Sequence, residues 1–413
     1  MTKIAIIGTG VAGLGCGYLL HREADVTLFD RNGYAGGHTN TVTVDEDGTP
    51  IPIDTGFMVF NEVTYPNLTR LFAELGVKTV PTSMSFGVQH CESGIEYCGS
   101  SVSQLFAQRR NLLRPRFLRM LACIDRFNKE ARSGMHSRLT LEQYGSVYGQ
   151  DFLELYLLPM ASAVWSTSFR DIRDFPAATL LRFFANHNLL GGLNGQHPWL
   201  TVAGGAKTYV EKMTAGFRDR IVLGNGVERV ERHASHVTLR LSDGSRCDFD
   251  KVIFACHADE ALLLLAKPTD DEWRLLLPFR YQQNMATLHT DPAPMPRSRR
   301  AWASWNVRVD GDRATTIYWM NSLQRVSQKR DYFVSIDDPG LIHPSRILQT
   351  IAYRHPVFAD ETAIAQRELA SLNAGRTFFC GSYFRYGFHE DAFTSAIAAS
   401  DAVRAELRGE AAA

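Results

Sequence analysis

The chain has 413 residues, more than one hydrophobic core usually serves, so we expect two domains. Its 44 Lys and Arg residues balance its 44 Asp and Glu residues, which gives no charge-based case for a nucleic-acid partner, and no apolar run approaches the ~20 residues that cross a bilayer. The seven cysteines form no Cys-x-x-Cys pair and no secretory signal precedes the first strand, so a reduced, cytoplasmic protein is expected.

A nucleotide-binding turn is predicted at the amino terminus. An apolar run at 4–7 predicts a buried strand, a helix is expected over 12–20, and Gly8, Gly10 and Gly13 stand at the junction. Gly8 allows the tight turn, Gly10 lets the backbone approach a pyrophosphate, and Gly13 permits close helix–strand packing. The helix amino terminus then offers free N–H groups to the phosphates. The pattern therefore predicts a dinucleotide site.

A second strand, at 26–29, ends in an acid and is followed by a second glycine motif. Asp30 stands where an acid can hold the ribose hydroxyls of either NAD or FAD. Gly36-Gly37-His38 follows, and this stretch resembles the second glycine motif of the flavin amine oxidase and phytoene desaturase superfamily. In those proteins an acid is followed by Gly-Gly-Arg along the FAD. The resemblance implies FAD, with His38 in place of the usual arginine.

The resemblance recurs at four further places, residues 53–58, 202–206, 226–256 and 377–399. In the superfamily the segment like 53–58 passes under the flavin ring. The segment like 202–206 returns the chain to the FAD domain ahead of a helix, and the segment like 226–256 meets adenine through its backbone. The fourth ends a strand in glycine, brings a polar residue to the ribityl chain and points a helix amino terminus at the flavin. Such a terminus stabilises a reduced, negatively charged flavin.

The resemblance implies that FAD is bound non-covalently by residues of these motifs. They are Gly8, Gly10, Ala12, Gly13, Asp30, Arg31, Gly36, Gly37, His38, Thr39, Gly56, Phe57, Val227, Gly381, Ser382, Asp391 and Ala392. Ser382 departs from the pattern, because an acid is more usual there. No cysteine lies between Cys256 and Cys380, where amine oxidases carry the one that attaches the flavin.

The expected fold class is α/β: a Rossmann-type FAD-binding domain, GR2-like and discontinuous, with an inserted α+β substrate domain. The FAD-binding domain is predicted from 1–85, 200–265 and 368–413, and the substrate domain from 86–199 and 266–367. Within the insertions we expect helices over 141–158 and 177–187, strands over 283–290, 301–309 and 315–321, and a hairpin turn at 310–312.

Within the superfamily the chain is most similar to a bacterial group of predicted NAD/FAD-binding oxidoreductases, through residues 36–42 and 54–61. Members tend to occur beside cyclopropane-fatty-acyl-phospholipid synthase-like methyltransferases, and some desaturate fatty acyl chains. The resemblance implies an FAD-dependent oxidoreductase that removes two hydrogens, as hydride to flavin N5, from a hydrophobic, acyl-lipid substrate. Two alternatives stay open: a flavin amine oxidase that uses O2, and a non-catalytic flavin-binding partner of a lipid methyltransferase. NAD-dependent dehydrogenation without a flavin would leave the later motifs unexplained.

Flavin dehydrogenation needs few catalytic side chains, because the protein mainly orients the substrate and tunes the cofactor. Removing hydrogen from an unactivated acyl chain would also need a base, and His389 is the candidate, at the flavin-facing end of the carboxyl-terminal motif. Amine oxidases often place a lysine near N5, for which Lys207 and Lys212 are the nearest candidates in sequence. The scattered histidines predict no metal site.

Residues 109–132 hold eight Lys and Arg residues against two acids, with apolar residues at helical spacing. This pattern is typical both of a helix packed on a core and of one that lies on an anionic lipid surface. We therefore keep peripheral contact with the inner face of the membrane as an expectation.

Overall fold

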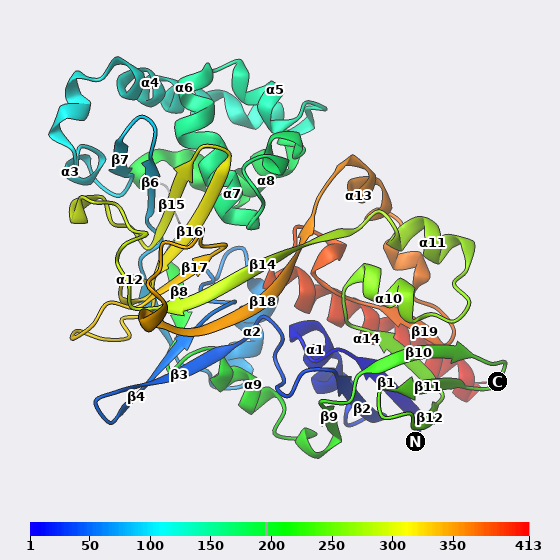
Figure 1. Ribbon diagram of the computed structural model, residues 1–413. Coiled ribbons are helices and arrows are strands. Elements are labelled where there is room, and N and C mark those ends of the chain that lie inside the picture. The colour runs from blue at the N-terminus through cyan, green and yellow to red at the C-terminus, as the bar shows by residue number, and fades with distance from the viewer. Residues whose placement is uncertain (195–196, 413) are drawn as a thin grey trace.

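The computed structural model describes residues 1–194 and 197–412 and shows two layers of sheet, each with its own helices (Figure 1). The first layer is a five-stranded parallel sheet in the order β19-β13-β1-β2-β9. Its strands are β1 (Lys3–Ile7), β2 (Asp25–Asp30), β9 (Ile221–Leu223), β13 (Lys251–Phe254) and β19 (Thr377–Phe379). The central strands β1 and β13 are apolar after an initial lysine, as a sheet covered on both faces requires.

Two helices cover one face of this sheet, and a small sheet covers the other. Helices α1 (Val11–Leu20) and α14 (His389–Ala412) pack together, and a Cβ at Gly15 would lie 2.9 Å from the Phe393 ring, so glycine is needed at this crossing. The opposite face packs on the antiparallel strands β10 (Val227–Arg232), β11 (Val237–Leu241) and β12 (Arg246–Phe249).

The second layer is a seven-stranded sheet in the order β18-β14-β17-β16-β15-β6-β7, antiparallel except where β6 pairs with β15. Its strands are β6 (Phe86–His90), β7 (Ile95–Cys98), β14 (Arg280–His289), β15 (Trp305–Asp310), β16 (Arg313–Trp319), β17 (Phe333–Ile336) and β18 (Ile347–Val357). The strands predicted over 283–290, 301–309 and 315–321 correspond to β14, β15 and β16 and are confirmed. The strand predicted to begin at 301 begins at Trp305 instead, and 299–301 form a 3-10 turn. The hairpin turn at 310–312 is also confirmed.

Helices gather at the end of this second sheet (Figure 1). They are α3 (Val102–Leu105), α4 (Pro115–Glu130), α5 (Leu141–Ser146), α6 (Gln150–Phe152), α7 (Leu158–Trp165) and α8 (Ala177–Asn186), with a π-helical turn at 153–157. The stretch expected to be helical over 141–158 is helical except at 147–149. Gly149 adopts φ +93°, which ends α5 and starts a new helix, whereas the helix expected over 177–187 is confirmed.

Shorter elements complete the chain: α2 (Pro66–Glu74), α9 (Lys207–Met213), α10 (Ala258–Leu264), α11 (Asp270–Leu276), α12 (Met320–Leu323), α13 (Asp360–Ala365), β3 (Thr41–Glu46), β4 (Thr49–Asp54), β5 (Thr79–Thr82) and β8 (Trp199–Val202). The five-stranded sheet draws its strands from 3–30, 221–254 and 377–379, and the seven-stranded sheet from 86–98 and 280–357. The exact domain boundaries at 85, 199, 265 and 367 stay a prediction.

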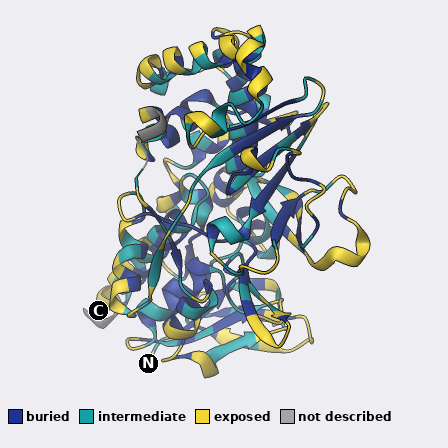
Figure 2. Cartoon of the chain, turned by 90° about the vertical axis from the view of Figure 1, so that its left-hand side faces the viewer, coloured by how far each residue is buried: buried dark blue, intermediate teal, exposed yellow. Residues whose placement is uncertain are grey.

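The basic segment 109–132 forms a 3-10 turn at 109–113 followed by α4. Phe117, Met120 and Phe127 are fully buried against the protein core, while Leu112 and Leu113 of the turn are exposed. Figure 2 shows this helical end with exposed residues along its outer side over a buried interior. The buried side of α4 is therefore covered by the protein, and the large apolar residues that this segment leaves exposed are Leu112, Leu113 and Leu118. No helix in the described ranges is long and apolar enough to cross a bilayer.

Candidate functional site

One cavity of about 790 Å³ runs along the carboxyl ends of the five-stranded sheet and on to the seven-stranded sheet. Its volume lies in the upper part of the range for ligand sites, which suits a dinucleotide and a substrate together. Nearly all of the predicted cofactor residues line it, and so does His389. The predicted residues outside the lining are Gly13, Thr39 and Asp391, which lie directly behind it.

The turn between β1 and α1 has the geometry of a phosphate cradle. A Cβ at Gly13 would lie 1.9 Å from the carbonyl oxygen of Gly8, so only glycine lets the helix start this close to the strand. A Cβ at Gly10 would meet nothing within 4 Å, because Gly10 faces the cavity. The first turn of α1 thus presents its backbone N–H groups to open space.

The second glycine motif lies back to back with the first. The Gly36 N–H donates to the Thr9 carbonyl at 2.9 Å, and a Cβ at Gly37 would lie 3.1 Å from the Gly10 Cα. Both positions have positive φ, +125° and +58°. The two motifs, 26 residues apart in sequence, therefore form one backbone wall, which fits a diphosphate held by main-chain groups.

Asp30 lies at the carboxyl end of β2, as predicted, and lines the cavity. Its Oδ2 accepts hydrogen bonds from the Thr9 N–H at 2.8 Å and the Thr9 hydroxyl at 2.6 Å, and its Oδ1 accepts from the Asn32 N–H at 2.9 Å. The carboxylate thus ties the glycine turn to β2 and keeps acceptor capacity toward the cavity. Arg31 is paired with Glu260 at 2.7 Å.

His38 lies between two aromatic rings at the cavity wall. Its ring stacks on Tyr353 at 4.7 Å and meets His355 edge-on at 5.1 Å. Burial, with the nearby His257, lowers the pKa of His38 to about 3. Its Nε2 is buried without a hydrogen-bond partner among the described residues. The histidine that replaces the usual arginine is therefore neutral.

His389, the first residue of α14, is held from behind by two hydroxyl groups. Its Nε2 lies 2.8 Å from the Thr39 hydroxyl and 3.1 Å from the Tyr209 hydroxyl, and those two hydroxyls lie 2.6 Å apart. The imidazole stacks on Phe57 with 3.9 Å between ring centres. Burial lowers the pKa of His389 to about 3, which makes it a weak proton acceptor and argues against the predicted role as base.

The neighbours of His389 at the start of α14 have structural partners. Asp391 accepts the Phe388 N–H at 2.9 Å, and burial raises the pKa of its carboxyl to about 7. Glu390 accepts from the Asn67 and Leu68 N–H groups, both at 3.0 Å, and so caps the start of α2. Sequence reasoning did not single out Glu390, because its partner helix lies more than 300 residues away in the chain.

The far part of the cavity, which we call the chamber, is lined by residues between 58 and 86, 160 and 199, and 283 and 318. These residues are Met58, Val59, Tyr65, Met84, Ser85, Phe86, Met160, Val164, Trp165, Ser166, Phe183, Leu189, Trp199, Gln283, Trp305 and Tyr318. No residue in this set is charged. The charged residues that line the cavity are Asp30, Arg31, Glu260 and Arg354, and Arg354 pairs across the sheet with Gln283 at the border of the chamber. Tyr386 and Phe388 reach the same cavity from the C-terminal motif.

Among the residues that the structure describes, no lysine lines the cavity. The Lys207 ammonium donates to the Thr43 hydroxyl, and that of Lys212 donates to backbone carbonyls at the end of α2. Neither lysine is therefore available to the chamber.

The comparisons with known proteins agree with this geometry. Residues 11–292 match the family described as flavin containing amine oxidoreductase. Three solved structures show the same fold. A CLA-producing fatty acid isomerase from P. acnes has 15% identity and a TM-score of 0.67, with 98% of each chain covered, and cyclohexylamine oxidase from Brevibacterium oxydans has 16% identity and a TM-score of 0.71, with 98% of this chain and 99% of that chain covered. A putative protoporphyrinogen oxidase from Exiguobacterium sp. has 15% identity and a TM-score of 0.67, with 98% of this chain and 99% of that chain covered. No curated protein matches the chain.

Proposed function

The chain belongs to the flavin containing amine oxidoreductases and is an FAD-dependent oxidoreductase, and within this family we propose that it removes two hydrogens from a hydrophobic, fatty-acyl substrate. The uncharged chamber carries this proposal. Each CH2 group that enters such a chamber gains roughly 0.8 kcal/mol, whereas an ammonium group without an anionic partner loses most of its hydration energy. The fold shared with a fatty acid isomerase supports the same substrate class.

We propose that the FAD is held by the predicted motif residues, with its diphosphate at the Gly10 and Gly37 wall and its flavin toward Gly56 and His389. The backbone of the two glycine motifs fits this group, as does the Asp30 carboxylate beside the cavity. When bound, FAD would supply the acceptor for the hydride at N5, and the reduced cofactor would take up the second hydrogen as a proton.

The chain itself orients the substrate and keeps water out. The Trp165 indole N–H donates to the Tyr386 carbonyl at 3.3 Å, which joins α7 to the loop before α14. Phe183 stacks on Phe388 with 5.0 Å between ring centres, so α8 closes the same wall. A chamber with walls fixed from both layers holds an acyl chain in few orientations, which is the main contribution that the protein makes to hydride removal.

An amine substrate is the second candidate, since aromatic walls also bind cations. Cyclohexylamine oxidase shares the fold, and so does a putrescine oxidase (14% identity, TM-score 0.68). Peripheral contact with a membrane, and a methyltransferase partner, remain proposals that follow from the acyl-lipid assignment.

Anaerobic titration of the FAD-loaded protein separates the two substrates. Fatty-acyl phospholipid in detergent should bleach the absorbance of the oxidised flavin, whereas cyclohexylamine and putrescine should not. Bleaching by amines alone would replace the acyl proposal with the amine oxidase, and bleaching by neither set would reject both. Heat-denatured protein with free FAD is the control for non-enzymatic reduction.

A further inference from the structure

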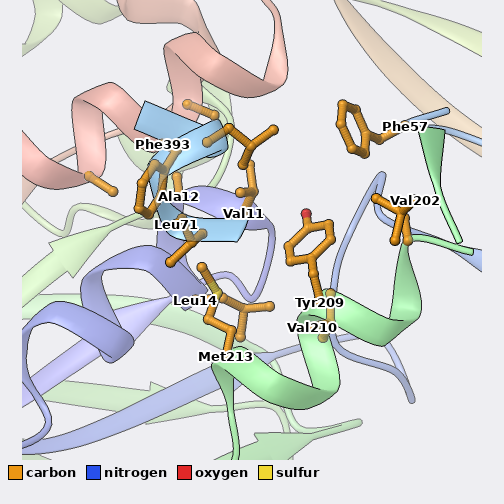
Figure 3. Packing of buried hydrophobic residues seen from close by; sticks show 14 of the residues in the cluster. Val11, Ala12, Leu14, Phe57, Leu71, Val202, Tyr209, Val210, Met213 and Phe393 are labelled. Atoms are coloured by element: carbon orange, nitrogen blue, oxygen red, sulfur yellow. The ribbon is translucent and has the colours of Figure 1, made fainter. Parts of the chain in front are cut away.

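The Thr39, Tyr209 and His389 side chains form a closed triangle of hydrogen-bonding groups behind the cavity wall. The three distances between their polar atoms are 2.6, 2.8 and 3.1 Å. Thr39 is 2% exposed and Tyr209 is fully buried, so water cannot complete their hydrogen bonds. In Figure 3 the Tyr209 hydroxyl points away from α9 toward the side of the cluster where Phe57 lies.

The protons in this triangle can be counted. Each hydroxyl has one hydrogen, and between the two hydroxyls only one hydrogen bond forms. The second hydroxyl hydrogen therefore needs another acceptor, and the Nε2 of His389 is the one within reach. If Nε2 carried a proton, one buried hydroxyl hydrogen would be left unpaired, at a cost of roughly 1–3 kcal/mol.

The other nitrogen of the ring faces the cavity. His389 lines the cavity, and within the described part of the chain its Nδ1 makes no hydrogen bond. Nδ1 is also absent from the set of buried, unbonded polar atoms, so it is accessible from the cavity. A neutral imidazole with a bare Nε2 carries its proton on Nδ1. The low pKa of this ring keeps it in the neutral form over the ordinary range of pH.

We propose that Thr39 and Tyr209 fix His389 in the Nδ1–H tautomer, so that His389 donates a hydrogen bond into the cavity, to the flavin end of the bound FAD. Thr39 and Tyr209 are positioning residues, since they act through His389. The donor stands at the amino terminus of the 24-residue helix α14, so both the N–H group and the helix end favour negative charge in the cavity. The proposal rests on the FAD orientation given under the proposed function, and it replaces the role of His389 as a base.

The tautomer can be measured on the FAD-loaded full chain labelled with 15N-histidine. The His389 signals, identified by their loss in His389→Asn, should show a protonated Nδ1 and a bare Nε2. Tyr209→Phe should keep this tautomer, because the Thr39 hydroxyl still reaches Nε2, and Thr39→Val combined with Tyr209→Phe should lose it. A protonated Nε2 in the unsubstituted protein, or in Tyr209→Phe, would overturn the proposal.

The donor role can be measured as the equilibrium constant for two-electron reduction of the bound flavin against a reference dye. His389→Leu should lower this constant by roughly tenfold or more, the loss expected for a hydrogen bond to a charged group. His389→Asn should stay within about threefold of the unsubstituted protein, because its amide nitrogen, like Nδ1, is bonded to the γ carbon. Equal shifts in both variants, or no shift in either, would contradict the donor role.

Neither readout uses a substrate. If acyl lipids fail to bleach the flavin while both results hold, only the proposed substrate fails. If the protein binds no FAD, the FAD-site assignment itself fails before His389 is tested.

Discussion

Gly10 and Gly13 in the β1–α1 turn provide a matched pair for locating the phosphates of FAD. Gly10 has φ −64° and ψ 176°, which alanine adopts freely, and a Cβ there would meet nothing within 4 Å. Gly10→Ala should therefore leave the fold unstrained while it places a methyl group in the cavity, where a pyrophosphate would approach. We expect the affinity for FAD to fall on the order of tenfold or more, about 1.4 kcal/mol, with little change in Tm when FAD is saturating.

Gly13→Ala should behave in the opposite way. Its Cβ would lie 1.9 Å from the carbonyl oxygen of Gly8, so α1 must move, and overpacking of this kind costs roughly 1–3 kcal/mol or more. This variant should lose Tm even with saturating FAD. The assay pairs quenching of flavin fluorescence on binding with thermal unfolding followed by circular dichroism. If Gly10→Ala bound FAD as tightly as the native chain, the phosphates would not lie at this turn.

Three further changes test other parts of the molecule. Val164→Asp puts a carboxylate into the uncharged chamber, so the rate of flavin bleaching by acyl lipid should fall roughly tenfold or more while the flavin content stays the same. Val164→Leu is the control. Equal losses in both variants would contradict the argument from charge. Leu113→Ser removes an apolar side chain that is 87% exposed. The fraction of protein that sediments with anionic vesicles should fall, whereas the fraction that sediments with neutral vesicles should not. Unchanged sedimentation would reject this turn as a membrane contact. The pKa of Asp391 is raised from 3.8 to about 7, so the stability from its protonated form is complete below pH 4 and is lost as the pH rises through 7. Asp391→Asn should therefore gain free energy of unfolding relative to the native chain over that interval, by at most about 4 kcal/mol, which is measured by chemical denaturation at each pH. Parallel pH profiles would show that Asp391 does not titrate there.

The sequence was sufficient to predict which residues line one end of the cavity, because each of the glycine motifs there is local. The glycines at 8, 10 and 13 act on a turn that they themselves form, and Asp30 reaches that turn through a neighbouring parallel strand. The same holds for Gly381 and the start of α14, which follow one another in the chain.

The chamber could not be predicted in the same way. Trp165, Trp199 and Trp305 come from α7, β8 and β15, and no short-range pattern marks them as neighbours. Periodicity also left details of two helical segments open. Residues 141–158 have the composition of one helix, but Gly149 breaks it, and the apolar side chains of α4 face the protein core, although the same pattern is compatible with a lipid surface.

The side chains around the cavity bring little net positive charge to a bound diphosphate. Arg31 and Arg354 both line the cavity; Arg31 pairs with Glu260, and Arg354 pairs with both Glu260 and Asp259, so two carboxylates balance the two guanidinium charges. His38 is neutral as well. In the FAD orientation that we propose, the dianionic diphosphate would be held mainly by backbone N–H groups at the start of α1 and along the two glycine motifs, which are fixed dipoles and need no counter-charge. Because such contacts depend on how closely the backbone approaches the phosphates, a methyl group at Gly10 is expected to weaken FAD binding more than the loss of either arginine.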